Sequence, residues 1–198
     1  MVKSNSAQPN NPQQAKWNQR YQQAERINPA ARVITDNLHL LPLQGNALEL
    51  ACGLGGNALE LAGQGLNTQA WDLSNIAIDK LQQLAELQQL PLQARCIDIQ
   101  QHSLSPESFD LICVTGFLER SLCPAIIAAL KPSGLLFYQT FTRAKINQSG
   151  PSNPQFLLQQ GELLSLFGAL TPLVYREELD SGKLEQGLRN QAYLVARK

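Results

Sequence analysis

The segment from Ala47 to Asp72, ALELACGLGGNALELAGQGLNTQAWD, constrains the fold more than any other part of the chain. It opens with an apolar run, continues through a glycine-rich loop and an amphipathic stretch, and ends in a second apolar run closed by an acid. This order predicts a strand, a glycine turn, a helix and a second strand, which form the first half of a nucleotide-binding α/β sheet. Glycine suits the turn because a sharp bend from strand to helix needs backbone angles that residues with a Cβ avoid.

Two acids beside this loop indicate which nucleotide-like cofactor it holds. Asp72 is placed to accept hydrogen bonds from both hydroxyls of a ribose. Residues 53–58 satisfy the pattern G-x-G-x-x-G/A, so an NAD(P)-dependent oxidoreductase is one alternative. Glu49 would repel a diphosphate at the helix start but would favour a cationic amino-acid end, such as that of S-adenosylmethionine. The other explanation of Glu49 is a strand residue that merely reaches solvent at the sheet edge.

At these residues the chain resembles the class I S-adenosylmethionine-dependent methyltransferases. Residues 49–56, ELACGLGG, are similar to their first motif, E/D-x-G-x-G-x-G, with Ala51 in place of the first glycine and Gly56 one position early. The chain is most similar to the small tellurite-resistance-type methyltransferases, through WNQRY at residues 17–21 and GELL at residues 161–164. The resemblance extends over nearly the whole chain.

The hydrophobic pattern predicts alternating strands and helices after a polar N-terminus. We expect a disordered tail over residues 1–14 and a single domain over residues 15–198. Strands are predicted near 47–51, 67–71, 92–97, 109–114, 135–140, 173–177 and 191–196. Helices are predicted near 15–26, between Pro29 and Pro42, and near 56–62, 74–89, 123–130 and 162–167. The last two strands are expected to form a hairpin, and the resemblance implies an α/β, Rossmann-like fold: a seven-stranded, mostly parallel sheet with an antiparallel C-terminal strand and helices on both faces.

Composition narrows the class of protein. The formal net charge of zero gives no electrostatic footprint for nucleic acid or an anionic membrane. The four cysteines lack metal-ligand spacing, and nothing resembles a membrane span or a signal peptide, so we expect a cytoplasmic protein without a metal. The chain after the fourth strand lacks the Asn/Asp-Pro-Pro-aromatic sequence of methyltransferases that act on base amines. We therefore expect a small-molecule substrate, no nucleic-acid or membrane partner, and a monomer or homodimer.

Ligands of open α/β sheets collect at the carboxyl ends of the strands. The resemblance implies that the glycine loop faces the methionine end of S-adenosylmethionine, Asp72 the ribose, and Asp98 the adenine amino group. Asp98 can also be a simple strand-end cap. A helix carrying Trp17, Arg20 and Tyr21 on one face either covers the cofactor or packs its two aromatics and exposes the arginine. The predicted cofactor residues are Trp17, Arg20, Tyr21, Glu49, Ala51, Gly53, Gly55, Asn57, Asp72, Leu73, Ser74, Asp98, Ile99, Thr115 and Gly116.

The sequence indicates the binding site of the methyl acceptor less clearly than that of the cofactor. In-line transfer to a thiol or a chalcogen oxyanion needs positioning more than a strong base, and a cation would hold an anionic substrate. Arg120 and Arg143 follow strands at the active edge and are predicted to position the substrate, with solvated surface charges as the alternative. Residues 142–156 form a long polar loop that we predict to be a substrate lid, with a plain surface loop as the alternative. A non-catalytic module that binds S-adenosylmethionine is a further alternative.

Overall fold

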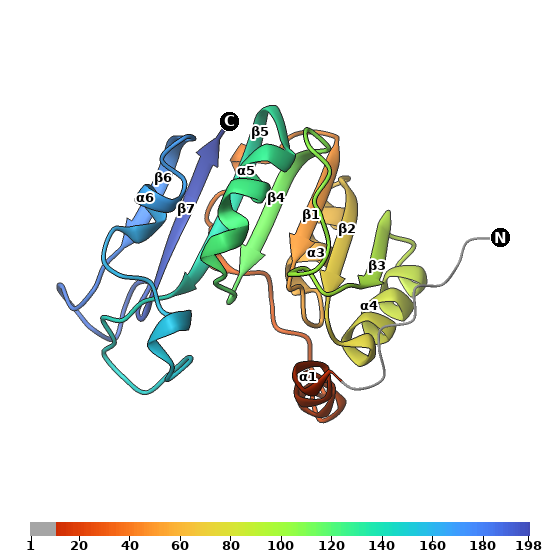
Figure 1. The fold of residues 1–198 in the computed structure, drawn as a ribbon, viewed down its shortest axis with the longest axis horizontal. Helices are drawn as coiled ribbons and strands as arrows, with labels where there is room; N and C mark the ends of the chain where they lie inside the picture. The colour runs from red at the N-terminus through yellow and green to blue at the C-terminus, as the bar shows by residue number, and fades with distance from the viewer. Residues whose placement is uncertain (1–10) are drawn as a thin grey trace.

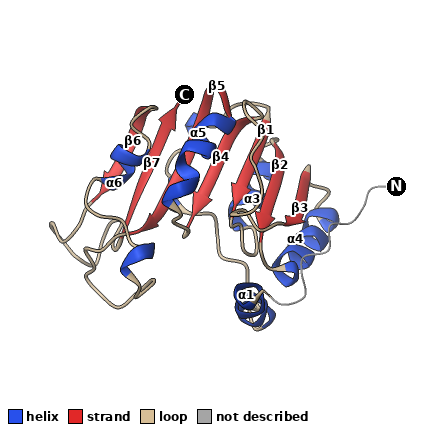
Figure 2. Ribbon diagram, viewed as in Figure 1, coloured by secondary structure: helices blue, strands red, loops and turns tan. Residues whose placement is uncertain are grey.

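Seven strands form one sheet in the order β3-β2-β1-β4-β5-β7-β6 (Figures 1 and 2). The structure is a computed structural model that describes residues 11–198. All neighbouring strands are parallel except that β7 runs antiparallel to both β5 and β6. The predicted sheet, with its antiparallel C-terminal strand and terminal hairpin, is thus confirmed. The strands are β1 Asn46–Leu50, β2 Asn67–Asp72, β3 Leu92–Cys96, β4 Phe109–Thr115, β5 Leu130–Phe141, β6 Thr171–Glu177 and β7 Gln191–Arg197.

The helices cover both faces of this sheet. They are α1 Pro12–Gln22, α2 Arg32–Thr35, α3 Gly56–Gly63, α4 Asn75–Leu87, α5 Cys123–Ala129 and α6 Glu162–Leu166, with short 3₁₀ turns at Leu38–Leu40, Arg120–Leu122 and Pro154–Phe156. Helices α5 and α6 share one core cluster with Leu48, Ile112 and Val114. Helices α2, α3 and α4 pack against the opposite face of the sheet. Strand β4 is apolar along most of its length because it is buried on both of these faces.

Helix α1 begins earlier and ends earlier than the sequence predicted. The Asn11 side chain accepts hydrogen bonds from the backbone N–H groups of Gln13 and Gln14, and Pro12 occupies the first turn. Residues 12–14, which we had predicted to belong to the disordered tail, therefore form the first turn of α1. The rest of that predicted tail, residues 1–10, lies outside the described residues.

The helix predicted between Pro29 and Pro42 is broken into two short pieces. Helix α2 ends at Thr35, and a 3₁₀ turn follows at Leu38–Leu40. The buried Asn37 side chain donates to the Val33 carbonyl at 3.0 Å, while its backbone N–H donates to Ile34. The side chain thus takes the acceptor that a continuing helix would use, which ends α2 at this point.

The connection from β3 to β4 leaves part of the sheet without a covering helix. Residues 97–108 contain no helix (Figure 2). The side chains of Gln69 and Arg95 on this face are polar, whereas the neighbouring Leu48 and Leu50 belong to the core. The face formed by β1, β2 and β3 on the α5 side is therefore covered by a loop alone.

Candidate functional site at the carboxyl edge of the sheet

The strand order reverses at β1, which lies between β2 and β4. The chain leaves β1 toward β2 on one side and later returns to β4 on the other, so the connecting loops diverge at the carboxyl end of β1. This is the position where open α/β sheets bind ligands. Helix α1 lies beyond the arrowheads of β1 and β2 and faces this edge (Figure 1). Most of the predicted cofactor residues meet here.

The glycine turn after β1 is imposed by backbone geometry. Gly53 and Gly55 have φ of 53° and 77°, in the left-handed region. A Cβ added to Gly56 would lie 2.0 Å from the Asn28 carbonyl oxygen, which leaves room for no other residue. Ala51 has φ of 54°, so this alanine adopts the glycine-like conformation at the position where the motif has its first glycine.

Glu49 organises the start of α3. The carboxyl group is 1% exposed, so it does not reach solvent. Its two oxygens accept hydrogen bonds from Asn57 Nδ2 at 2.6 Å and from the Ala58 backbone at 2.8 Å. Burial raises the pKa of Glu49 to about 8. In this structure each oxygen of Glu49 thus accepts one hydrogen bond from the start of α3, and its contact with a cofactor ammonium stays a prediction.

Asn57 links three segments around the turn. Its Nδ2 donates to Thr115 Oγ1 at 2.7 Å as well as to Glu49, and its Oδ1 accepts from the Ala31 backbone at 2.7 Å. Asn57 is buried at the first turn of α3. The side chain predicted to touch a cofactor thus fixes β1, β4 and the segment before α2 relative to one another.

Asp72 connects the end of β2 to the glycine loop. Its carboxylate, 6% exposed, accepts from the Gly53 backbone and from the Ser74 backbone, each at 2.8 Å. Burial raises the pKa of Asp72, while these bonds act in the opposite direction. Ser74 in turn caps α4 through Ala77 at 3.2 Å, as the sequence predicted. Asp72 therefore sets the position of the loop that the glycines make possible.

Helix α1 is attached to this region by polar contacts. Gln14 Nε2 donates to the Leu73 carbonyl at 2.9 Å, and Ser74 Oγ donates to Asn18 Oδ1 at 2.6 Å. Lys80 on α4 donates to the Tyr21 carbonyl at 2.7 Å, at the C-terminal end of α1. Sequence reasoning missed Gln14, Asn18 and Lys80, because nothing local marks contacts between residues so far apart in the chain.

The aromatic face of α1 carries two stacked rings and an exposed arginine. Trp17 and Tyr21 stack with their ring centroids 5.8 Å apart, and the exposed Arg20 guanidinium lies 5.3 Å from the Trp17 ring. The Tyr21 hydroxyl lies against the glycine loop, since a Cβ on Gly53 would be 2.7 Å from it. Burial raises the pKa of Tyr21. Tyr21 is thus the member of this group that faces the candidate site.

The ends of β3 and β4 contribute the remaining predicted residues. The Asp98 carboxylate accepts from the Gln100 backbone at 3.1 Å and from Gln101 Nε2 at 2.9 Å, which is the strand-end cap foreseen as an alternative. Ile99 is partly buried against the core. Gly116 is exposed, and a Cβ added there would meet nothing within 4 Å. The edge beside Thr115 is therefore open.

The two predicted substrate arginines differ in their surroundings. Arg120 donates twice to Glu162, at 2.7 and 3.0 Å, and also to the carbonyls of Gln155 and Leu157. The guanidinium lowers the pKa of Glu162. Arg143 is exposed, and its charge also helps to lower the pKa of Glu162. The Arg120 side chain thus bonds to other parts of the chain, whereas the Arg143 side chain is exposed to solvent.

The predicted lid is tethered at two places. Arg120 binds its C-terminal part through the carbonyl of Gln155. The buried Asn190 binds the other part: its Oδ1 accepts from the Ile146 backbone at 2.7 Å, and its Nδ2 donates to Ser149 Oγ at 2.6 Å. Neither tether was predicted, although Glu162, the partner of Arg120, lies in the GELL stretch.

Residues 11–198 contain no cluster of three or more His, Cys, Asp or Glu side chains that could hold a metal ion. In the same residues, no helix has the length and apolar character needed to cross a membrane.

Comparison with known proteins gives a family match. The family model described as tellurite resistance protein TehB matches residues 14–190. TehB from Haemophilus influenzae aligns with a TM-score of 0.67 at 22% identity, over 93% of this chain and 66% of that chain. An S-adenosylmethionine-dependent methyltransferase from Mesorhizobium loti aligns with a TM-score of 0.67 at 14% identity, over 85% of this chain and 98% of that chain. At these identities, the structural matches establish the shared fold.

Curated relatives match shorter stretches. A ubiquinone biosynthesis O-methyltransferase of Coxiella burnetii is 32% identical over 103 residues, or 50% of this chain and 44% of that protein. Hemagglutinin 1 of Eikenella corrodens is 38% identical over 87 residues, or 42% of this chain and 29% of that protein. The chain thus spans less than half the length of these curated relatives.

Proposed function

Because this chain belongs to the TehB tellurite resistance family, we propose that it uses S-adenosylmethionine to methylate a small-molecule acceptor. The resemblance predicted from residues 49–56 is confirmed at the level of the family. The observation that carries the proposal is the carboxylate of Asp72, which joins the glycine turn to the end of β2. The family match also favours a methyltransferase over the dinucleotide-dependent oxidoreductase.

The residues at the edge fit the proposed cofactor. Each oxygen of Asp72 accepts one backbone N–H, and a carboxylate has about four acceptor sites, so about two remain for ribose hydroxyls. Gly116 is exposed beside open space, which leaves room for a ligand against the end of β4. Tyr21 on α1 lies over the glycine loop on the other side. When bound, S-adenosylmethionine would supply a methyl group activated by its sulfonium.

The chain's own contribution to the reaction would be positioning. Holding two reactants in line can lower a barrier by roughly 7–11 kcal/mol. Arg143 follows β5 with its guanidinium exposed, so it is the better of the two predicted arginines for holding an anionic acceptor. A thiolate or a chalcogen oxyanion would need no strong base, because each is already a soft anionic nucleophile. Water excluded by the loop of residues 142–156 would leave such an anion more reactive.

Cofactor choice can be tested by thermal unfolding with S-adenosylhomocysteine, NAD or NADH. A ligand at about 100 times its Kd stabilises the folded state by about 2.7 kcal/mol, which is several degrees in a domain of this size. We expect S-adenosylhomocysteine alone to raise the melting temperature. A rise with the dinucleotides alone would contradict the proposal.

Catalysis can be tested separately by following transfer of a labelled methyl group to thiols and to chalcogen oxyanions. We expect Arg143→Gln to reduce turnover on an anionic acceptor at least tenfold without changing the affinity for S-adenosylhomocysteine. Arg197→Gln, which removes an exposed arginine on β7, is the matched control. Cofactor binding with no transfer to any acceptor would favour the non-catalytic module.

A further inference from the structure

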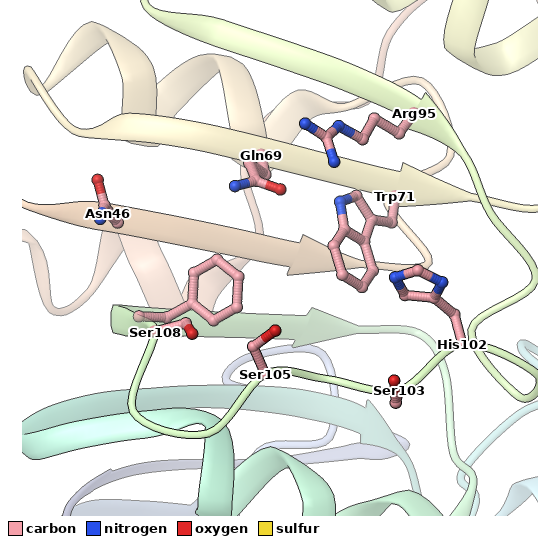
Figure 3. A pocket seen from close by; sticks show the side chains of 9 residues that line it. Asn46, Gln69, Trp71, Arg95, His102, Ser103, Ser105 and Ser108 are labelled. Carbon is pink, nitrogen blue, oxygen red and sulfur yellow. The ribbon is translucent and has the colours of Figure 1, made fainter. Parts of the chain in front are cut away.

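A pocket of about 430 Å³ lies over the part of the sheet face, formed by β1, β2 and β3, that the β3–β4 loop covers without a helix (Figure 3). Its floor comes from strand residues, among them Gln69, Trp71 and Phe109. Its wall comes from the loop that joins β3 to β4, including His102 and Ser105. The cavity therefore exists because residues 97–108 cross this face without forming a helix.

The lining of the pocket is rich in hydrogen-bond donors. None of its 9 lining residues is an aspartate or a glutamate. Arg95 contributes a guanidinium whose one hydrogen bond among the described residues is to Gln93 Oε1, at 2.7 Å. Several of its N–H donors therefore stay available, and Gln69 and the serine hydroxyls can add more. The composition favours an anionic ligand over a cationic one.

Trp71 provides a specific, unpaired donor in this pocket. The residue is 5% exposed, and its Nε1 is buried with no hydrogen-bond partner in the structure. A buried donor left unpaired is destabilising, because it has lost its hydrogen bonds to water without gaining another. Figure 3 shows the indole nitrogen on the side of the ring that faces the Arg95 guanidinium. Two donors thus face each other, and an acceptor oxygen between them would pair with both.

The aromatic rings around Trp71 fix the direction of this donor. The His102 ring meets the indole edge-on, with the centroids 5.1 Å apart and the planes at 88°. The remainder of the indole packs into the core cluster that contains Phe109 and Leu50. The packed indole ring therefore cannot readily turn its Nε1–H toward another acceptor. An acceptor must enter the pocket to pair with it.

We propose that this pocket binds a small oxyanion, a carboxylate or a phosphate group, between Trp71 Nε1 and the Arg95 guanidinium. The charge-assisted bond to arginine supplies attraction, and the indole N–H supplies direction. The exposed Arg95 side chain can move to admit the anion, because its one described partner is the neighbouring Gln93. This pocket adjoins the proposed cofactor site, because Trp71 precedes Asp72 and His102 lies on the same loop as Asp98, but its binding of an anion does not depend on methyl transfer.

The indole N–H of Trp71 reports directly on binding. The chain has two tryptophans, so a ¹H–¹⁵N spectrum carries two indole signals, and Trp17→Phe identifies the one from Trp71. Inorganic phosphate and benzoate are added separately, with chloride holding the ionic strength constant. We expect a saturable shift of the Trp71 signal with at least one of them, and the effective anion shows which oxyanion the site takes.

Arg95→Gln should weaken the response at least tenfold, because it removes the cation and leaves the indole in place. Arg197→Gln, an exposed arginine on β7, should leave the titration unchanged. No saturable shift with either anion, or the same affinity in Arg95→Gln, would overturn the proposal. These readouts require neither cofactor nor turnover, so they stand apart from the test of the proposed function.

Discussion

At the scale of single residues, Glu49 is a carboxyl group removed from water without a cationic partner among the described residues. Its pKa is raised from 4.5 to about 8 by burial. Between these values the folded protein keeps a proton that the unfolded chain has released. Raising the pH therefore favours the unfolded state. The contribution of Glu49 to the stability of the fold is fully present below about pH 4.5 and is lost as the pH rises through about 8.

We therefore expect the wild-type protein to lose unfolding free energy between pH 5.5 and 7.5 relative to Glu49→Gln. The difference should grow by up to about 1.4 kcal/mol per pH unit. Urea unfolding of both proteins at the two pH values measures it. Parallel pH dependences would mean that Glu49 is ionised in the folded protein.

Asp72 gives a second prediction at this scale. Asp72→Asn keeps the shape of the side chain but replaces one acceptor oxygen with a donor, which then faces a backbone N–H. We expect a loss of about 1–3 kcal/mol in stability. Affinity for S-adenosylhomocysteine, measured by calorimetry, should fall at least tenfold. Asp79→Asn, on the exposed side of α4, should change neither quantity, and unchanged affinity in Asp72→Asn would remove Asp72 from the proposed site.

The sequence predicted the position of both acids better than their partners. Glycine spacing and the apolar runs indicate where the strands end, so Glu49 and Asp72 could be placed at one edge. The N–H groups that they accept from belong to the loop and to α3, and their directions depend on the folded turn. The Lys80 bond to α1 has no sequence signal, because it forms between helices that are distant in the chain.

At the scale of elements, Arg120 and Glu162 connect the turn after β4 to the start of α6. Their pair is bidentate but partly exposed, with side-chain exposures of 34% and 15%. We expect a coupling of about 1 kcal/mol rather than the larger value of a buried pair. The carbonyl bonds of Arg120 add order to residues 155–157.

Removing this contact should loosen the loop before it affects the whole fold. Arg120→Gln is expected to speed proteolytic cleavage within residues 142–157, and Glu162→Gln should do the same. The double variant should be slower than the two single effects combined would predict, because each change already breaks the shared Arg120–Glu162 contact. Additive effects would show that the two residues act independently. Mass spectrometry of the fragments locates the cuts.

The elements themselves followed from the sequence where a single pattern dominated. Apolar runs located all seven strands, and Ser74 marked the start of α4 as predicted. The start of α1 was missed because the polar tail masked Asn11 as a cap. The helix after Pro29 was overestimated because its end depends on Asn37 turning back onto Val33.

At the scale of the whole molecule, all seven strands belong to one sheet, with core clusters on both of its faces. Strand β4 lies between the two, with Ile112 in one cluster and Leu111 in the other. We expect residues 11–198 to unfold in one cooperative transition. In Trp17→Phe, the fluorescence of Trp71 and the far-ultraviolet circular dichroism should give the same midpoint. Separate midpoints would show that the terminal hairpin unfolds on its own.

Helix α1 has a further consequence for the molecule as a whole. It contains no buried residue and is attached through side-chain bonds from Gln14, Asn18 and Lys80. Such a segment can swing away while the core stays intact, because opening exposes mainly the half-buried Trp17 and Tyr21. In the proposed reaction, each cycle would require a spent cofactor to leave and a fresh one to enter. The turnover rate would then depend on how often α1 moves away from the site. Higher solvent viscosity would slow turnover even where the chemical step is fast.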